Sequence, residues 1–300
     1  MSGAPASERS ASAARQEDLS DHVRRDRETA NALRAAIAAR TMVRPGLVPE
    51  LVPLRPNSAV CCTVRVDAVS QQEAVNRVVE WPSGIVVHLC NSYTLALARK
   101  DKAYAAMLND SDLNLPDGTP LAWLGRRNGI PGFERATRGP DLMRQSLIQG
   151  RQRGLRHFLY GSTPEVLELL QAQIAEFAPG AIIVGAESPP FGDQDEDAFA
   201  AAAARMRDVG ADVVWVGLGT PRQDWAAAAL GRHSAAVIIP VGAAFDFLAG
   251  TKREAPAFLR DSGLEWLFRL ATEPRRLWRR YLLGNVGFLW GIMRGGVRQV

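Results

Sequence analysis

Short apolar runs alternate with longer amphipathic segments from about residue 59 onward. The runs have the length of β-strands, are rich in branched residues and end at glycine or proline turns. They span residues 84–90, 113–118, 157–161, 181–185, 212–219 and 235–246. The segments between them, such as 92–108, 164–177 and 195–210, have the spacing of helices. Because the runs are apolar on both faces, the pattern predicts an α/β fold with a Rossmann-like parallel sheet flanked by helices.

Composition divides the 300-residue chain into three parts. Residues 1–58 are rich in Ala, Arg, Ser and Pro, which predicts a flexible N-terminal extension. Residues 59–251 carry the alternating pattern and are the expected Rossmann-like core. Residues 252–300 hold ten basic and four acidic side chains, a net charge of +6 in a chain whose total is +4. This local charge predicts a basic C-terminal appendage that meets an anionic partner.

Cysteine usage and hydropathy limit the class of protein. The cysteines Cys61, Cys62 and Cys90 include an adjacent pair and form no CxxC or zinc-type spacing. We therefore expect a reduced, cytoplasmic protein without a structural metal. The first residues lack the apolar core of a secretory signal, and no apolar run reaches the roughly 18 residues of a spanning helix.

Polar residues gather where four of the predicted strands end. They occupy residues 90–94, 116–119, 219–224 and 242–246. The carboxyl ends of parallel strands share one edge of a sheet, and a helix that starts at this edge can bind phosphate. For any one cluster, the glycines and prolines could equally serve only to form a turn. Four clusters on one edge favour a ligand crevice.

Two aspartates at this edge are candidates for chemistry. Asp117 follows a short apolar strand and precedes Gly118, so its carboxylate is expected to project at the edge. Partial burial would raise its pKa and suit it to deprotonate a sugar hydroxyl, although a simple turn aspartate is the alternative. Asp246 stands in a similar place, with capping or structural use as its alternative.

Familiar cofactor and metal motifs are not supported. Asp110-Ser-Asp112 precedes its strand, and Asp193-Gln-Asp195 opens an alanine-rich helix, where acidic residues favour the helix dipole. Gly217-Leu-Gly219 lacks the third glycine of a dinucleotide fingerprint, and a P-loop motif is absent. We therefore expect neither a metal nor a cofactor.

The basic tail has an internal pattern. On a helical projection, one face carries Leu277, Trp278, Tyr281 and Leu282, and the other carries Arg275, Arg276, Arg279 and Arg280. This split is typical of a helix lying on an anionic membrane surface. The alternative is a helix docked on the core with a solvated basic face. Nucleic acid is not an expected partner, because the basic residues are confined to the tail.

At these residues the chain resembles the WecG/TagA/CpsF family, glycosyltransferase family 26. Six segments carry the resemblance in the family's order. They are residues 91–118 (NSYTLALARKDKAYAAMLNDSDLNLPDG), 138–143 (RGPDLM), 158–170 (FLYGSTPEVLELL), 215–225 (WVGLGTPRQDW), 242–256 (GAAFDFLAGTKREAP) and 263–281 (GLEWLFRLATEPRRLWRRY). The first 58 residues lie outside the resemblance.

The resemblance implies an inverting enzyme at the inner membrane face that moves a sugar from a UDP-sugar donor to a polyprenyl-diphosphate-linked acceptor, without a metal. Such enzymes build cell-surface polysaccharide or teichoic acid, with N-acetylmannosamine, its uronate, glucose or a related hexose as the sugar, and some self-associate as homo-oligomers. Asp117 matches the proposed base. The matched binding residues are Asn91, Thr94, Gly118, Arg135 or Arg138, Asp141, Gly161, Gly219, Pro221, Gln223 and Asp246. The matched appendage would supply Arg275, Arg276, Arg279 and Arg280 to the lipid diphosphate and the membrane.

The chain departs from the family's pattern at three points. Leu89 stands where some members have a threonine, so a hydroxyl role there would pass to Thr94 or Ser92. Asp224 replaces the usual glutamate and is one methylene shorter. The family's arginine could be Arg135 or Arg138.

Two rival functions are a non-catalytic partner that stimulates another membrane transferase and a nucleotide-binding regulator. Retention of Asp117, Asn91 and Gln223 argues against the first. The second has no need of the amphipathic tail.

Overall fold

The computed structural model describes most of the chain after residue 57. The described residues are 58–80, 84–130, 133, 136–192, 194–256, 258–259, 265–275, 277–278, 284, 288 and 297–299. All of them belong to one unit of the chain, Val52–Val300. Of the expected flexible extension, residues 1–57 lie outside the described residues, so its character stays a prediction.

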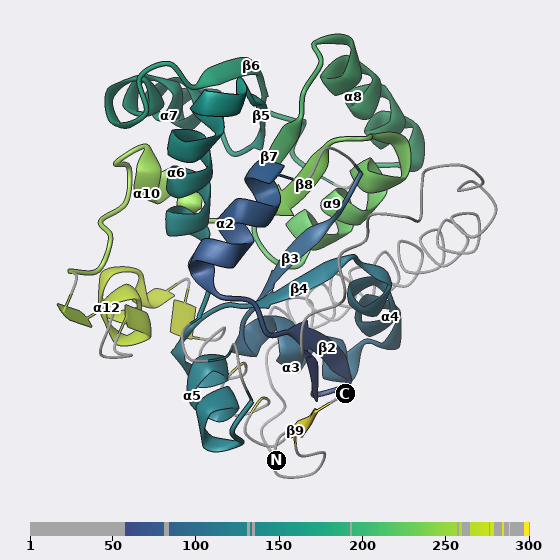
Figure 1. Ribbon diagram of the computed structural model, residues 1–300, viewed down its shortest axis with the longest axis vertical. Helices are drawn as coiled ribbons and strands as arrows, with labels where there is room; N and C mark the ends of the chain where they lie inside the picture. The colour runs from purple at the N-terminus through teal and green to yellow at the C-terminus, as the bar shows by residue number, and fades with distance from the viewer. Residues whose placement is uncertain are drawn as a thin grey trace, which may run out of the picture. The chain divides into compact units, whose positions relative to one another are not determined.

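Parallel strands form the centre of this unit, as the sequence pattern predicts (Figure 1). Four of them pair in the order β6-β5-β7-β8, and two more pair as β3-β4. The strands are β3 (Val87–Cys90), β4 (Leu113–Pro116), β5 (Arg156–Gly161), β6 (Ile182–Glu187), β7 (Val213–Gly217) and β8 (Val237–Pro240). Every pairing among them is parallel, so their carboxyl ends point the same way.

The β3-β4 pair continues the four-stranded sheet. A parallel bridge joins Val86, just before β3, to Ile238 in β8. The backbone N–H of Ile238 donates to the carbonyl of Ile85 at 2.8 Å, and Gly84 N–H donates to the carbonyl of Ala235. The strands therefore lie in the spatial order β6-β5-β7-β8-β3-β4, with β3 beside β8.

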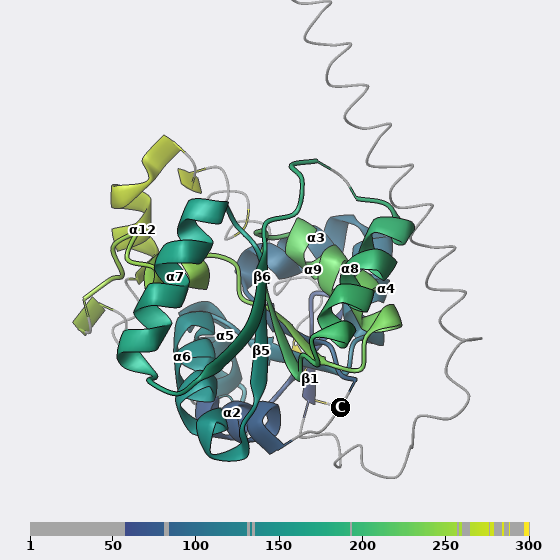
Figure 2. The same cartoon turned by 90° about the horizontal axis from the view of Figure 1, so that it is seen from above.

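Helices cover both faces of the sheet (Figure 2). One layer consists of α2 (Gln71–Glu80), α6 (Gly139–Gly150), α7 (Pro164–Phe177) and the short α10 (Ala244–Leu248). The other consists of α3 (Ser92–Lys100), α4 (Lys102–Asp110), α8 (Glu196–Asp208) and α9 (Arg222–His233). Further helical elements with described bounds are α5 (Thr119–Arg127), η2 (Arg151–Arg153) and α12 (Glu265–Thr272). The expected α/β fold with flanking helices is confirmed.

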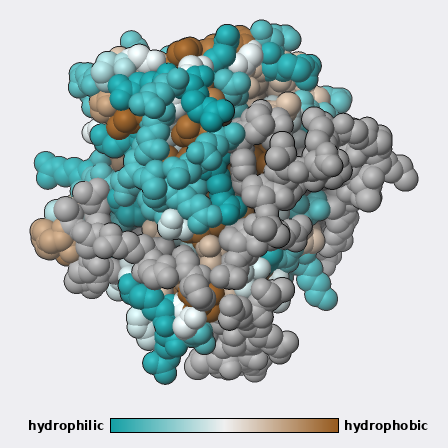
Figure 3. Space-filling model, viewed as in Figure 1, coloured by the Kyte–Doolittle hydropathy of each residue, from teal (hydrophilic) through white to brown (hydrophobic). Residues whose placement is uncertain are grey.

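Alternate residues of each strand belong to opposite cores. In β7, Val213 and Trp215 pack with α2, α6 and α7, whereas Val214 and Val216 pack with α8 and α9. This follows from the two-residue period of a strand. The outer surface of the layer containing α2 and α6 is mostly hydrophilic (Figure 3), so the apolar stripes of these helices face the sheet.

A second, antiparallel sheet was not expected from the sequence. It has the order β2-β1-β9, in which β1 (Ser58–Cys61) pairs with both β2 (Val64–Asp67) and β9 (Val297–Gln299). Phe288 is also buried. The end of the predicted C-terminal appendage is therefore a strand of the folded unit. No helix in the described part of the chain is both long enough and apolar enough to cross a membrane.

The predicted helical segment 92–108 is two helices. Asp101 separates them, and its carboxylate accepts from the backbone N–H groups of Ala103 and Tyr104 at 2.8 and 3.1 Å. The side chain is thus the N-cap of α4. A capping aspartate of this kind offers the backbone an alternative to continuing the first helix.

Gly231 on α9 gives a test of the β3–β8 junction. A Cβ at this position would overlap Cγ2 of Val86, so we expect Gly231→Ala to lower the free energy of unfolding by roughly 1–3 kcal/mol. The same change at an uncrowded helix position raises stability by about 1 kcal/mol. In a Val86→Ala background, Gly231→Ala should therefore stabilise. Urea unfolding of the four proteins measures both effects, and equal effects in the two backgrounds would contradict the close contact.

Candidate active site

A cavity of about 630 Å³ lies at the carboxyl ends of the central strands. Its walls include Asn91 after β3, Asp117 after β4, the Gly217–Thr220 turn after β7 and the Val241–Ala244 turn after β8. Residues from α12 complete the wall. The cavity therefore lies at the strand ends, where crevices of open parallel sheets bind ligands.

Asn91 and Asp117 are held next to each other by the pairing of β3 with β4. The backbone N–H of Asp117 donates to the carbonyl of Cys90 at 2.9 Å, which extends the ladder by one residue. The Asn91 side-chain amide donates to the Asp117 carboxylate at 3.4 Å. Its oxygen accepts from the backbone N–H and the hydroxyl of Thr94 at 3.1 and 3.3 Å. These contacts fix which end of the amide faces Asp117.

The carboxyl group of Asp117 is more basic than an ordinary aspartate. Burial raises its pKa, and the negative charge of Glu265 raises it further. The hydrogen bond from Asn91 and the positive charges of Arg269 and Arg138 act in the opposite direction, but the net pKa is raised. Such a group is suited to accept a proton near neutral pH.

The turn after β7 is closed by a side chain of its own helix. The Gln223 side-chain oxygen accepts from the backbone N–H of Gly219 at 3.0 Å, and its amide nitrogen contacts the Thr220 hydroxyl at 3.3 Å. Gly242 has φ of 55°, which favours glycine, and a Cβ there would lie 2.8 Å from the Gln223 oxygen. Gln223 thus holds the turn after β7 and lies close to the turn after β8.

Asp224 anchors α9 below the cavity floor. Its side chain is fully buried and accepts from the Tyr104 hydroxyl at 2.7 Å, while His88 Nδ1 lies 3.2 Å from its other oxygen. Burial and the adjacent Asp224 raise the pKa of Tyr104 well above its usual range. Asp224, which is one methylene shorter than the glutamate usual in the family, therefore links α9 to Tyr104 of α4 and His88 of β3.

Arg138, at the start of α6, lines the cavity and contacts three carboxylates. They belong to Asp141 at 2.6 Å, Glu254 at 2.8 Å and Glu265 at 3.2 Å. Burial alone would lower the pKa of Arg138, but Glu265 and Glu254 raise it above its ordinary value. The guanidinium is thus firmly charged, and two of its partners come from the C-terminal part of the chain. Of the two candidate arginines, Arg135 lies outside the described residues.

Arg269 of α12 was not predicted from the sequence, yet it lines the cavity. Its guanidinium lies 5.2 Å from the ring centre of Phe247, and its buried Nε has no hydrogen-bond partner among the described residues. A buried N–H donor without an acceptor lowers the stability of the fold, and a bound acceptor removes this cost. Arg269 follows Glu265 by four residues, a spacing that places both side chains on one face of a helix. Glu265 also lines the cavity, so this spacing is the feature of the sequence from which Arg269 could have been found.

The cavity also contains Gly118, Gly219 and Asp246 from the predicted set. Gly118 and Gly219 have φ of 84° and 78°, values that favour glycine. Asp246 has a structural contact as well, because Lys252 Nζ lies 2.8 Å from its carboxylate. Gln223, Asn91, Asp117 and Arg138 are in the same cavity, so the structure brings the two halves of the predicted site together.

Four other predicted binding residues do not line the cavity: Thr94, Asp141, Gly161 and Pro221. Thr94 and Asp141 reach it only through Asn91 and Arg138. A Cβ at Gly161 would lie 2.9 Å from the Gly217 backbone, so its glycine serves the packing of β5 on β7.

Of the four arginines predicted for the lipid diphosphate, the structure describes Arg275, which is exposed and does not line the cavity. Arg276, Arg279 and Arg280 lie outside the described residues, so their role stays a prediction. Nearby Leu277 is buried and Trp278 is exposed.

Four helices begin at the cavity wall. Residues from the first turns of α3, α5, α6 and α9 line it, and each of these helices has nine residues or more. The amino end of a helix carries partial positive charge and unpaired N–H groups. Together with Arg138 and Arg269, these ends make the cavity suited to an anionic ligand.

Metal-binding clusters of three or more His, Cys, Asp or Glu side chains do not occur among the described residues. One aspartate from each of the two Asp-X-Asp sequences has a structural contact. Asp112 accepts from the backbone N–H of Val86 at 2.9 Å, and Asp195 caps α8.

The sequence of the chain is similar to that of known proteins. The family described as "Glycosyl transferase WecG/TagA/CpsF family" matches residues 60–300. A relative from Bacillus spizizenii is 33% identical over 62% of this chain and 70% of its own length. A second, from Bacillus subtilis, is 30% identical over 66% of this chain and 75% of its own length.

Both relatives are named N-acetylglucosaminyldiphosphoundecaprenol N-acetyl-beta-D-mannosaminyltransferase. The family match covers the sheet, all the described cavity residues and α12. The chain therefore belongs to the WecG/TagA/CpsF family of glycosyl transferases.

Proposed function

We propose that the chain transfers a sugar, with N-acetylmannosamine as the first candidate, from a UDP-linked donor to N-acetylglucosaminyl-diphospho-undecaprenol. The two relatives named above support the choice of sugar and acceptor. The observation that carries the proposal is the placement of Asp117 and the Gln223-braced turn in one cavity that also contains Arg138 and Arg269.

The donor's UDP group would bind on the β7–β8 side of the cavity. The glycine turn 217–219 leaves room for a diphosphate to approach the backbone, and the amino end of α9 favours its charge. Gln223 supports this turn and would contact the nucleotide. The proposal requires neither a metal nor a cofactor.

Asp117 would act as the base on the β3–β4 side. It removes the proton from the acceptor hydroxyl as that oxygen attacks the anomeric carbon of the donor sugar. The bond from this carbon to the UDP oxygen breaks, and UDP leaves with the bonding electrons. Attack on the face opposite UDP inverts the anomeric centre. The raised pKa of Asp117 matches this role.

Arg138 and Arg269 would hold the diphosphate of the acceptor or stabilise the charge on departing UDP. Arg269 lines the cavity, and its buried Nε has no hydrogen-bond partner among the described residues. An acceptor with an undecaprenyl chain stays in the bilayer, so the enzyme would work at the inner membrane surface as a peripheral protein. The basic residues of 252–300 would add attraction to anionic lipid.

Asp117→Asn should separate chemistry from binding. We expect kcat to fall by about 10²-fold or more, because the amide cannot accept the proton, while the Kd for UDP changes little. Gln223→Ala should do the opposite and weaken UDP binding by loosening its turn. Calorimetry with UDP and a UDP-release assay measure the two effects. Asp197→Asn, on the exposed side of α8, is the matched control, and an unimpaired Asp117→Asn enzyme would refute the assignment.

Glu265→Gln should shift the pH profile of the reaction. A base works only when unprotonated, so kcat/KM falls as the pH drops through the pKa of Asp117. Because Glu265 raises that pKa, its neutralisation should move the acid limb to lower pH. The measurement is kcat/KM against pH, with Glu168→Gln on α7 as the control. An acid limb that stays in place or moves to higher pH would contradict the coupling.

A further inference from the structure

Eight large apolar side chains are exposed among the described residues. Four of them, Phe258, Trp266, Leu267 and Trp278, belong to residues 258–278, and Trp123 is on α5. Leu169, Ile182 and Phe191 are exposed elsewhere. Trp123, Trp266 and Trp278 are tryptophans, the residue type enriched where a protein meets the membrane–water interface.

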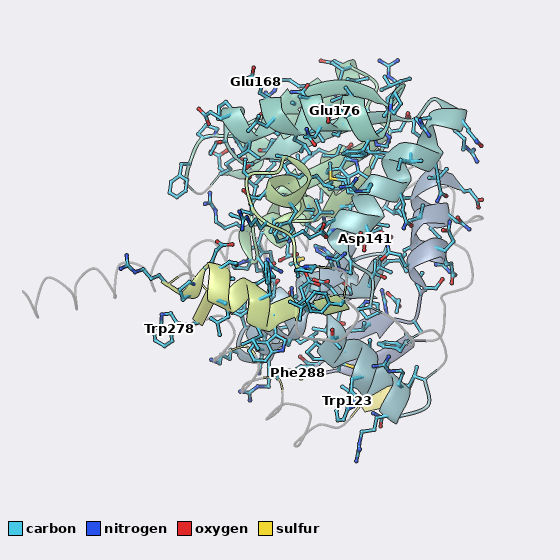
Figure 4. The ribbon with its side chains drawn as sticks, turned by 90° about the vertical axis from the view of Figure 1, so that its left-hand side faces the viewer. Trp123, Asp141, Glu168, Glu176, Trp278 and Phe288 are labelled. Carbon is cyan, nitrogen blue, oxygen red and sulfur yellow. The ribbon has the colours of Figure 1, made fainter. Side chains whose placement is uncertain are left out.

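Helix α5 has a buried side, a cavity side and an outward side. Leu121 and Leu124 are buried, while Ala122 and Arg126 line the cavity. Trp123 points outward and is 51% exposed (Figure 4). The Arg127 guanidinium lies 5.6 Å from the centre of its ring. The outward side therefore pairs an amphipathic aromatic ring with a fixed positive charge.

The charged residues of α5 itself, Arg126 and Arg127, are both basic. Residues 118–130 include two arginines and no acidic residue. A surface made for a second protein copy would need acidic or apolar groups to match, whereas anionic lipid headgroups match this one directly. The flat interface of a bilayer also accommodates a single indole ring without a shaped pocket.

Helix α12 lies on another part of the cavity rim. Trp266 lines the cavity and is 38% exposed, and the adjacent Leu267 is 48% exposed. Trp278, farther along the same part of the chain, also points away from the protein (Figure 4). Exposed aromatic groups thus occur on two of the helices that line the cavity, α5 and α12.

We propose that α5 is a second membrane-contacting element, in which Trp123 and Arg127 rest on an anionic bilayer while the C-terminal part of the chain contacts it elsewhere along the rim. The inference rests on the proposed function, because a lipid-linked acceptor can enter only if the cavity opens toward the membrane. Two contacts on different sides of the rim hold the opening there, whereas one contact leaves the orientation free.

Vesicle binding of the full-length chain tests the contribution of α5. With vesicles of phosphatidylglycerol and phosphatidylcholine, Arg127→Gln should weaken partitioning by about five-fold, the effect of one interfacial arginine. Trp123→Ala should weaken partitioning at least as much. On vesicles of phosphatidylcholine alone, the effect of Arg127→Gln should vanish, whereas the effect of Trp123→Ala should remain. Phe191→Ala is the matched control, since Phe191 is also an exposed aromatic with an arginine, Arg222, 5.1 Å from its ring centre.

A direct measure of contact uses a polarity-sensitive dye on an introduced cysteine. The native Cys61, Cys62 and Cys90 are buried and have raised pKa values, so labelling favours an exposed site. Dye on Trp123→Cys should shift to the blue when anionic vesicles are added, and dye on Phe191→Cys should not.

The proposal would be overturned if the Trp123→Ala and Arg127→Gln variants partition onto vesicles as well as the wild-type protein does. It would also be overturned if the emission of the dye at position 123 does not shift. A change of oligomeric state in Trp123→Ala with vesicle binding intact would overturn it as well, because the surface would then serve a second copy. An assay of sugar transfer to a detergent-dispersed acceptor distinguishes failure of the proposed function from failure of the α5 contact. If wild-type protein shows no transfer in detergent, the proposed function fails; if transfer persists while the α5 variants bind vesicles normally, only the α5 contact fails.

Discussion

The junction between β3 and β8 is the contact on which the whole cavity depends. A bridge from Val86 to Ile238 places β3, which Asn91 follows, beside β8, which precedes Gly242. Without it, the two groups of polar turns would belong to separate sheets. The junction is reinforced where α9 crosses it, by the close approach of Gly231 to Val86 and by the buried Asp224 network. Packing below the site therefore determines the geometry above it.

Charge is balanced differently in the two halves of this cavity. On the β7–β8 side, positive potential comes from backbone turns and helix ends, which cannot change their protonation. On the α6–α12 side the positive groups are two side chains. Arg138 is balanced by the carboxylates of Asp141, Glu254 and Glu265, and the Nε of Arg269 has no partner among the described residues. Asp117 lies between these influences. Its raised pKa reflects burial and Glu265 outweighing the two arginines and Asn91.

Much of the core could be predicted from the sequence because parallel strands have local signatures: an apolar run, a glycine turn and a helix start. These signatures placed Asp117, Asn91 and Gln223 at one edge. The pairing of β9 with β1 joins segments more than 200 residues apart and has no local pattern, so it could not be predicted. Arg269 was not predicted either, because the direction of a side chain is not visible in a sequence.

Helix α12 has some residues that line the cavity and others, close by in sequence, that are exposed on the surface. Glu265 and Arg269 are four residues apart and both line the cavity, whereas Leu267, midway between them, is exposed. If Leu267 contacts a bilayer and α12 shifts as a result, Glu265 and Arg269 must therefore move with the helix. Because Glu265 contacts Arg138 and raises the pKa of Asp117, the position of α12 sets both the anion-binding strength of the cavity and the basicity of its carboxylate. Removal of residues 252–300 would disturb all of these together, along with β9, so single substitutions separate them better.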